Sequence, residues 1–363
     1  SGLALWPLTG RYPIVFSRHG SEVSHLAFAH GGEWLATSSA EGTARLWPLD
    51  GDPPPYGRIL RGTGAYQTGL AASTDGRSLL VGSKNGSWLL PVDGEPPRKL
   101  AGFKGQTGQA AFSPEGRFAA QIGGRTESSE RVIRVWDTST WSDVVELEFD
   151  AGEKPCLDCL QFTDGSGLLA ATDSGLFLWD LETGDRELLW EGPFGGSFAN
   201  SADGRRVVLI EREDGNTEAG HAVLLDVGSH TAKTLYNFGD KIIGVAMDPE
   251  GTFLATGSLD GELSVGLLTD GKPHLLLGHE ASVSRVAIDP RNRWIASGSG
   301  DSTIRLWPIP DLSKPPLHTL PHDELIAKLK TLTNLRVVRD EDSVSGWKLT
   351  HDPFPGWETV PSW

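Results

Sequence analysis

Hydrophobic and polar residues alternate along short stretches of this chain, and tight turns separate the stretches. The pattern is clearest in three segments, which begin at positions 34, 253 and 294 and read WLATSSAEGTARLWPL, FLATGSLDGELSVGLL and WIASGSGDSTIRLWPI. In each segment an alternating stretch leads to a turn with Asp or Glu and then to a second alternating stretch. A period of two residues is typical of β-strands with one buried face. The pattern therefore predicts repeated antiparallel strand pairs.

The strand pairs recur at a nearly constant interval. The position held by Trp307 returns every 41 to 46 residues when it is followed back along the chain. It falls at Trp6, Trp47, Pro91, Trp136, Trp179, Leu225, Gly266 and Trp307. Each interval also contains an outer and an inner strand pattern, so a repeat holds four strands, which is the content of a β-propeller blade. We therefore predict an all-β propeller with repeats at about 9–50, 51–94, 95–139, 140–182, 183–228, 229–270 and 271–310.

Short motifs at the turns resemble those of the WD-repeat family over about residues 1–310. A Gly-His pair at Gly278-His279 precedes the inner strand of the last repeat, and a Trp-Asp pair stands at Trp136-Asp137 and Trp179-Asp180. The resemblance implies that a His, a Ser or Thr, an Asp and a Trp of one blade form a chain of hydrogen bonds. The matching residues are His279, Ser297 (or Ser299), Asp301 and Trp307 in the last repeat, and His19, Glu41 and Trp47 in the first.

The ring has two possible closures. A seven-bladed ring closes when a strand at 12–16 joins the last repeat, which leaves a strand at 1–8 and a tail at 311–363. In an eight-bladed ring, residues 1–8 and 12–16 complete an eighth blade with strands from the tail, and no sheet edge is left exposed. We favour eight blades, closed by strands from both chain ends within a single domain that spans 1–363.

The tail contains four patterns of its own. Residues 315–323 predict an outer strand, and residues 322–334 predict one short helix. The apolar face of this helix holds Leu325, Ile326, Leu329 and Leu332. Residues 335–349 predict a hairpin around an acidic turn. The aromatic stretch at 350–363 predicts a strap packed across the propeller, with a docking peptide as the alternative.

The composition of the chain argues against a nucleic-acid or membrane partner. The chain has 32 basic and 48 acidic residues and a formal charge of −16, which repels a nucleic-acid backbone. No apolar run is long enough to span a bilayer, so we expect no membrane partner.

Cys156 and Cys159 cannot supply the four ligands of a structural zinc site. Because residues three apart on a strand point to opposite faces, we expect both to be buried free thiols.

Sequence motifs for catalysis are missing. The chain has no metalloprotease, nucleophile-elbow or phosphate-loop motif, and most Asp and Glu residues stand in Gly-containing turns. We therefore predict a protein that is not an enzyme and that has no catalytic residue, no metal and no cofactor. A metal-dependent propeller enzyme is kept as a distant alternative.

Two expanded loops indicate where binding would occur. They lie at 123–131 and 211–221, and the family resemblance places them on the top face of the propeller with the residues before each inner strand. We expect this face to bind a protein or peptide. The candidate binding residues are Glu22, Tyr66, Gln106, Lys154, Phe194 and Lys241. The alternative function is a purely structural spacer or oligomerisation domain.

The tail carries a second resemblance. The strings LPHDELIAKLKTLTNLRVVRD and GWKLTHDPFPGWETVPSW are similar to the C-terminal ends of WD-repeat regions in large bacterial signalling proteins with serine/threonine-kinase or STAND-type NTPase architectures. This similarity implies an effector domain fused before residue 1 and makes the chain a sensing or protein-interaction module. The low cysteine content suits a cytoplasmic location.

Overall fold

A computed structural model describes residues 13–17, 19–29, 31–49, 57–60, 66–125, 130–163, 167–192, 194–212, 220–239, 241–269, 271–325, 327, 336–339 and 347–350. The chain divides into two compact units, which are described separately. One unit contains residues 13–312, and the other combines residues 1–12 with 313–363.

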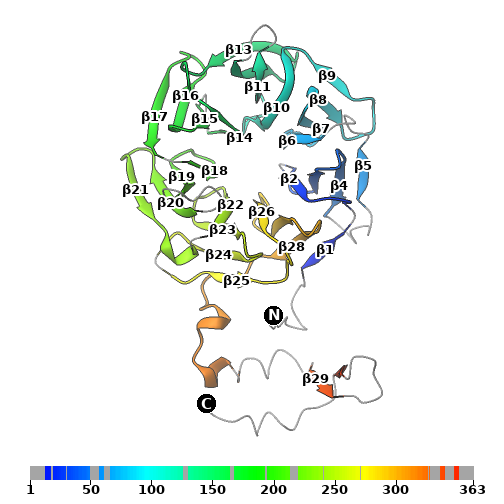
Figure 1. Cartoon of the computed structure of the whole chain (residues 1–363), viewed down its shortest axis with the longest axis vertical. Helices are drawn as coiled ribbons and strands as arrows, with labels where there is room; N and C mark the ends of the chain where they lie inside the picture. The colour runs from blue at the N-terminus through cyan, green and yellow to red at the C-terminus, as the bar shows by residue number, and fades with distance from the viewer. Residues whose placement is uncertain are drawn as a thin grey trace. The chain divides into compact units, whose positions relative to one another are not determined.

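The larger unit is a ring of β-sheets, with one strand of each sheet toward the centre (Figure 1). We number its four-stranded units as blades 1 to 7. Blade 1 holds β2 (Val23–Phe28), β3 (Trp34–Ser39), β4 (Ala44–Pro48) and β5 (Arg58–Leu60). Blade 2 holds β6 (Gln67–Ala72), β7 (Ser78–Ser83), β8 (Gly86–Pro91) and β9 (Arg98–Leu100). Blade 3 holds β10 (Phe103–Phe112), β11 (Phe118–Arg125), β12 (Arg131–Asp137) and β13 (Ser142–Glu148).

The other four blades follow in chain order. Blade 4 holds β14 (Pro155–Phe162), β15 (Gly167–Thr172), β16 (Gly175–Asp180) and β17 (Arg186–Glu191). Blade 5 holds β18 (Phe194–Asn200), β19 (Arg206–Arg212), β20 (Gly220–Asp226) and β21 (Thr231–Thr234), and a 3-10 turn, η1 (Tyr236–Phe238), follows it. Blade 6 holds β22 (Ile242–Met247), β23 (Phe253–Ser258), β24 (Leu263–Leu267) and β25 (His274–Leu276). Blade 7 holds β26 (Val283–Ile288), β27 (Trp294–Ser299), β28 (Ile304–Pro308) and, as its fourth strand, β1 (Ile14–Phe16).

The second strand of a blade is covered on both faces by the neighbouring blades. All six residues of β27 are buried, and this strand combines apolar with small polar residues. Such packing places large side chains between blades, and Trp47, Trp136, Trp179 and Trp307 are among the largest fully buried ones. Blades 5 and 6 are also joined by one strand pair, Gly220 with Ile242, and so form one eight-stranded sheet.

The ring closes through the first described strand of the chain. β1 pairs antiparallel with β28, with Val15 opposite Arg305. Phe16 is buried and stacks on Trp47 with ring centroids 4.3 Å apart, so β1 is held by blade 1 as well.

The eight-bladed arrangement is not confirmed. The described residues form five separate four-stranded sheets and the eight-stranded sheet of blades 5 and 6. The strand predicted at 12–16 completes the last repeat, as in the seven-bladed alternative, because its apolar Ile-Val-Phe sequence matches the edge of β28. The strand predicted at 1–8 lies outside the described residues.

The smaller unit contains a hairpin and short helical segments. Strands β29 (Arg336–Arg339) and β30 (Trp347–Thr350) pair antiparallel, where the hairpin was predicted at 335–349, and β30 extends one residue beyond that range. The chain is helical at 322–325 and at 327, and the rest of the helix predicted to residue 334 lies outside the described residues. The aromatic stretch after Thr350 does so too.

The outer strand predicted at 315–323 is wrong. That segment instead contains a 3-10 turn, η2 (Leu317–Thr319), and the start of the helical residues. Pro315, Pro316 and Pro321 explain the difference, because proline has no backbone N–H to give to a strand ladder and is well tolerated at the start of a helix.

The prediction of two free thiols is also wrong. Cys156 and Cys159 form a disulfide in β14. The argument from strand alternation fails here because the pairing register of β14 with β15 shifts between Pro155 and Leu160. The intervening residues therefore do not follow the regular two-residue period of a strand.

The closure by β1 leads to a test with two neighbouring residues. We expect Phe16→Ala to lower the free energy of unfolding by about 3–5 kcal/mol, because it removes a buried ring from the contact with Trp47. Val15 is 46% exposed on the same strand, so Val15→Ala should change it by only about 0.5 kcal/mol. Denaturant unfolding followed by tryptophan fluorescence measures both. Equal losses in the two variants would contradict closure through the buried face of β1.

Candidate functional site

A chain of largely buried hydrogen bonds links the segment before β2, strands β3 and β4, and the turn between these two strands in blade 1. Glu41 Oε1 lies 3.2 Å from His19 Nδ1, and His19 Nε2 lies 2.8 Å from Thr37 Oγ1. The indole N–H of Trp47 donates to the same Thr37 oxygen at 2.9 Å. Because a carboxylate only accepts, Nδ1 carries the proton and Nε2 accepts from the Thr37 hydroxyl. Every polar group in this chain is thereby paired.

Blade 7 contains the same arrangement with an aspartate. Asp301 Oδ2 lies 2.9 Å from His279 Nδ1, and His279 Nε2 lies 2.7 Å from Ser297 Oγ. Trp307 donates to Ser297 Oγ at 2.8 Å, whereas the Ser299 hydroxyl donates to the carbonyl of Ala281. The choice left open between Ser297 and Ser299 thus falls on Ser297 in this geometry.

The ionisation of these groups suits a structural role. Burial lowers the pKa of both His19 and His279 below 6.5, although the neighbouring carboxylates oppose the shift. Burial acts to raise the pKa of Asp301, but hydrogen bonds from Thr303, the Glu280 amide and His279 outweigh it and lower the pKa to about 2. The imidazoles are therefore neutral and Asp301 is charged near pH 7.

Five of the six candidate binding residues are exposed, four of them directly before an inner strand and Gln106 within the first half of β10. They are Glu22, Tyr66, Gln106, Lys154 and Lys241, and we call the surface that they define the top face. In four of them the backbone carbonyl accepts a hydrogen bond from an amide of the turn between the second and third strands: Glu22 from Ala40, Tyr66 from Lys84, Lys154 from Asp173 and Lys241 from Leu259. The rigid part of each blade thus fixes these positions.

The sixth candidate, Phe194, is not exposed with the other five. It is only 9% exposed and packs against Phe198 in the core between blades 4 and 5. An aromatic ring at the start of β18 gains more from this apolar surface than from water. Of the expanded loops, residues 126–129 and 213–219 lie outside the described residues.

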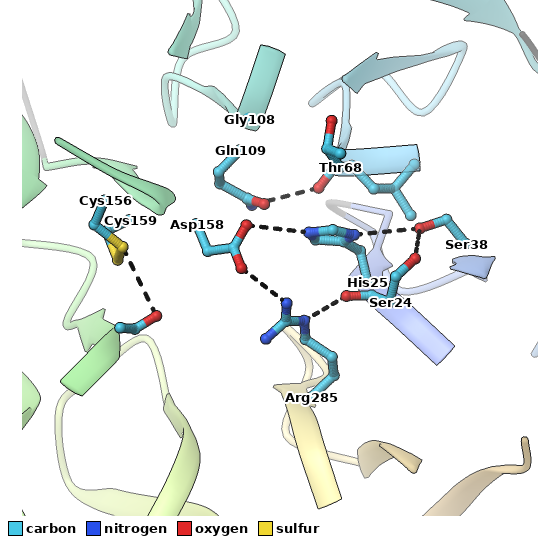
Figure 2. Close-up of polar contacts among 12 residues, drawn as sticks. Ser24, His25, Ser38, Thr68, Gly108, Gln109, Cys156, Asp158, Cys159 and Arg285 are labelled. Carbon is cyan, nitrogen blue, oxygen red and sulfur yellow. Dashed lines mark hydrogen bonds and ion pairs between the residues drawn. A yellow bond between two sulfur atoms is a disulfide. The ribbon is translucent and has the colours of Figure 1, made fainter. Parts of the chain in front are cut away.

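Sequence reasoning missed a polar cluster at the centre of the ring. It contains Ser24, His25, Ser38, Asp158 and Arg285, and we call it the axial cluster (Figure 2). The Arg285 guanidinium of blade 7 donates to Asp158 Oδ2 of blade 4 at 3.0 Å and to the carbonyl of Ser24 in blade 1. Because blade 4 is not a neighbour of blades 1 and 7, these contacts cross the axis of the propeller.

The imidazole of His25 completes the axial cluster. Nδ1 lies 3.4 Å from the Ser38 hydroxyl, and Nε2, which has no hydrogen-bond partner among the described residues, lies 3.8 Å from Asp158 Oδ1. Burial lowers the pKa of His25, and Asp158 only partly opposes this. Burial acts to raise the pKa of Asp158, but His25 and the Arg285 charge outweigh it and lower the pKa to about 2.

One sequence signal for this cluster was present. His25, Gln109 and Arg285 each stand three residues before the end of an inner strand, where the first strand of blade 6 has Gly244. Large polar residues at one repeat position indicate a shared polar environment. Asp158 breaks this spacing, because the irregular backbone of β14 moves it by one residue, so the pattern alone could not include it.

Within the described part of the chain, no group of three or more His, Cys, Asp and Glu side chains could hold a metal ion. No helix among the same residues is long and apolar enough to cross a membrane.

Comparison with known proteins identifies the repeats. The model of the WD domain, G-beta repeat, matches residues 10–48, 231–265 and 271–308. The chain is 25% identical to a WD repeat-containing protein 26 homolog from Arabidopsis thaliana over 81% of this chain and 49% of that protein. It is 26% identical to a WD repeat-containing protein WDS homolog of the same plant, over 81% of this chain and 56% of that one. It is 25% identical to human Striatin-4, over 80% and 42%.

These comparisons support the WD40 repeats and the propeller but leave finer features open. The chain spans about half the length of these curated relatives. All three come from eukaryotes, so they do not support the similarity of the tail to bacterial signalling proteins.

The hydrogen-bond chain of blade 1 can be tested at its central hydroxyl. We expect Thr37→Val to lower the free energy of unfolding by about 1–3 kcal/mol, because the substitution leaves His19 Nε2 and the Trp47 N–H buried and unpaired. Thr37→Ser retains the hydroxyl and should recover most of the loss. Denaturant unfolding measures both, and a valine variant as stable as wild type would contradict the prediction.

The contribution of Asp158 to stability should depend on pH. Its pKa of about 2 in the folded protein lies below its ordinary value of 3.8, so the unfolded chain takes up the proton first as the pH falls. The stabilisation is therefore complete above about pH 4 to 5 and is lost as the pH falls toward 2. We expect the difference in thermal midpoint between wild type and Asp158→Asn to shrink from pH 6 to pH 3. A difference that stays constant or grows over this range would show that the folded-state pKa is not lowered.

Proposed function

We propose that this chain, a propeller with WD40 repeats, is a non-catalytic platform that binds a protein partner through a peptide segment laid on its top face. The observation that carries the proposal is the exposure of Glu22, Tyr66, Gln106, Lys154 and Lys241 before or early in the inner strands of blades 1, 2, 3, 4 and 6. A ligand on this face would contact several blades at once. Because the blades are rigid, little conformational entropy is lost from the platform on binding.

Two of these residues have the chemistry of an interface anchor. The ring of Tyr66 is 37% exposed, and the Lys84 ammonium lies 5.3 Å from its centroid, so the ring is held in place. Lys241 forms an exposed ion pair with Asp260 at 2.8 Å. Tyrosine is enriched among residues that dominate binding energy, whereas an exposed ion pair contributes little to folding stability.

We further propose that the platform acts within a longer polypeptide. The support is the similarity of its tail to the ends of WD-repeat regions in bacterial signalling proteins, where an effector domain precedes the propeller. The WD repeat-containing relatives and Striatin-4 are themselves longer than the stretch that matches this chain. In such a protein, binding at the top face would report the presence of a partner to the fused effector.

The top face can be tested with two matched triple variants. One combines Tyr66→Ala, Lys154→Ala and Lys241→Ala, and the control combines Tyr236→Ala, Lys233→Ala and Lys272→Ala, which change the same residue types at exposed positions at outer strands and loops. Partners captured from an extract of the source organism by wild-type protein are quantified by mass spectrometry. We expect the top-face variant to lose about tenfold or more of the specific partner and the control to retain it.

Other outcomes would distinguish the alternatives. Equal recovery by both triple variants would overturn the assignment of the binding face. If wild-type protein captures no partner, and no extract fraction raises its thermal midpoint, the structural spacer is favoured, because a ligand that binds only the native state must stabilise it.

A further inference from the structure

The disulfide of blade 4 lies directly beside the axial cluster (Figure 2). Cys156 and Cys159 bracket Leu157 and Asp158 in β14, and Asp158 is the residue that brings blade 4 into the axial cluster. We propose that this cysteine pair is a redox modification site: a dithiol reductant opens the disulfide, and its opening releases Asp158 from Arg285 and His25. The proposal goes beyond a binding function, because it assigns a chemical switch to the centre of the ring.

The strand ladder gives the backbone between the two cysteines little support, although Leu157 packs against the core between blades 3 and 4. Regular pairing of β14 with β15 is interrupted between Pro155 and Leu160, so the ladder does not fix the four residues from Cys156 to Cys159. On the side of blade 3, Gly108 leaves room for the carbonyl of Leu157, and a side chain there would collide with it. The disulfide is thus the covalent restraint that holds this irregular segment, and with it the Asp158 side chain, in position.

The two sulfur atoms differ in accessibility. Cys156 is half-buried, and its Sγ lies 4.0 Å from the carbonyl of Gly196, whereas Cys159 is 1% exposed and belongs to the core between blades 4 and 5. Thiol–disulfide exchange requires direct approach of a thiolate to one sulfur. Cys156 is therefore the sulfur that a reductant attacks, and Cys159 is the leaving group.

The dithiol reduces the disulfide in two exchange steps. A thiolate of the dithiol forms a bond to Cys156 Sγ, the bond between Cys156 and Cys159 breaks, and Cys159 leaves as a thiolate that takes up a proton. The second thiolate of the reductant then attacks the reductant's own sulfur in the mixed disulfide, which releases Cys156 to be protonated. The protein gains two electrons and two protons, and the dithiol becomes a disulfide.

Release of Asp158 would change contacts in three blades. Arg285 holds Asp158 of blade 4 and the Ser24 carbonyl of blade 1, at sequence separations of 127 and 261 residues. When Asp158 moves away, the guanidinium and the buried His25 Nε2 lose their shared anionic partner. Reduction of the cysteine pair would thereby remove the ion pair between Asp158 and Arg285 at the axis. This effect can be measured as a difference between wild type and Asp158→Asn in how far the thermal midpoint falls on reduction.

The test compares reduction in wild type and in Asp158→Asn. Native protein is incubated with dithiothreitol, alkylated and weighed by mass spectrometry, and thermal midpoints are measured before and after reduction. We expect two alkyl groups to be added and the midpoint of wild type to fall further than that of Asp158→Asn, by about 2 °C or more. Asp173→Asn is the matched control in the same blade and should respond as wild type does. Cys156→Ser/Cys159→Ser should not respond to dithiothreitol.

Two results would overturn the proposal. One is a disulfide that dithiothreitol leaves intact in the folded protein. The other is an equal fall of the midpoint in wild type and Asp158→Asn, because a merely structural disulfide stabilises both to the same extent. If Asp158→Asn does not fold, Arg285→Gln removes the same ion pair from the other side and gives the same comparison.

Discussion

The pairing of β1 with β28 is the contact on which the rest of the ring depends. Each blade buries its two faces against its neighbours, so a blade at an open end of the ring would expose one whole face to water. β1 completes the outer edge of blade 7 and also carries Phe16 onto Trp47 of blade 1. Three arginines reinforce the same seam: Arg285 donates to the Ser24 carbonyl, Arg293 donates to the Gly32 carbonyl at 2.5 Å, and Arg291 pairs with Glu33 at 2.9 Å. Backbone pairing, ring stacking and charge thus act at one boundary.

The repeat period predicted the propeller because each blade needs the same four strands and turns, and this requirement is local in the sequence. The resemblance to the WD-repeat family indicated most residues of the two hydrogen-bond chains, such as His279 and Asp301, but not Thr37. What could not be predicted depends on contacts that leave no periodic signal. The pairing partner of residues 14–16 is decided by an edge far away in the sequence, the disulfide by a local irregularity of β14, and the burial of Phe194 by its neighbour blade. Asp158 of the axial cluster falls in this class, because it breaks the repeat spacing and meets Arg285 only after the ring has formed.

The two polar systems of the molecule have different consequences. The hydrogen-bond chains of blades 1 and 7 lie within single blades, contain neutral histidines and leave no polar group unpaired, so they stabilise without offering a group for chemistry. The axial cluster joins separate blades, contains a charged pair, and leaves one buried nitrogen of His25 without a hydrogen bond. A rigid frame therefore surrounds a centre whose contacts are fewer and easier to rearrange. This contrast is the basis for proposing recognition on the surface of the frame and regulation at the centre.

The position of β1 also affects how the polypeptide reaches its native state. Residues 14–16 leave the ribosome long before their partner at 304–306 exists, so closure is among the most non-local steps in this fold. Blades 1 to 6 are able to form in the order of synthesis, but β1 must wait without its partner until the strands of blade 7 have been made. During that interval β1 of one molecule and β28 of another present complementary edges, which is the geometry of a domain-swapped chain of propellers. Efficient production of the monomer thus depends on closure within one molecule being faster than encounter between two.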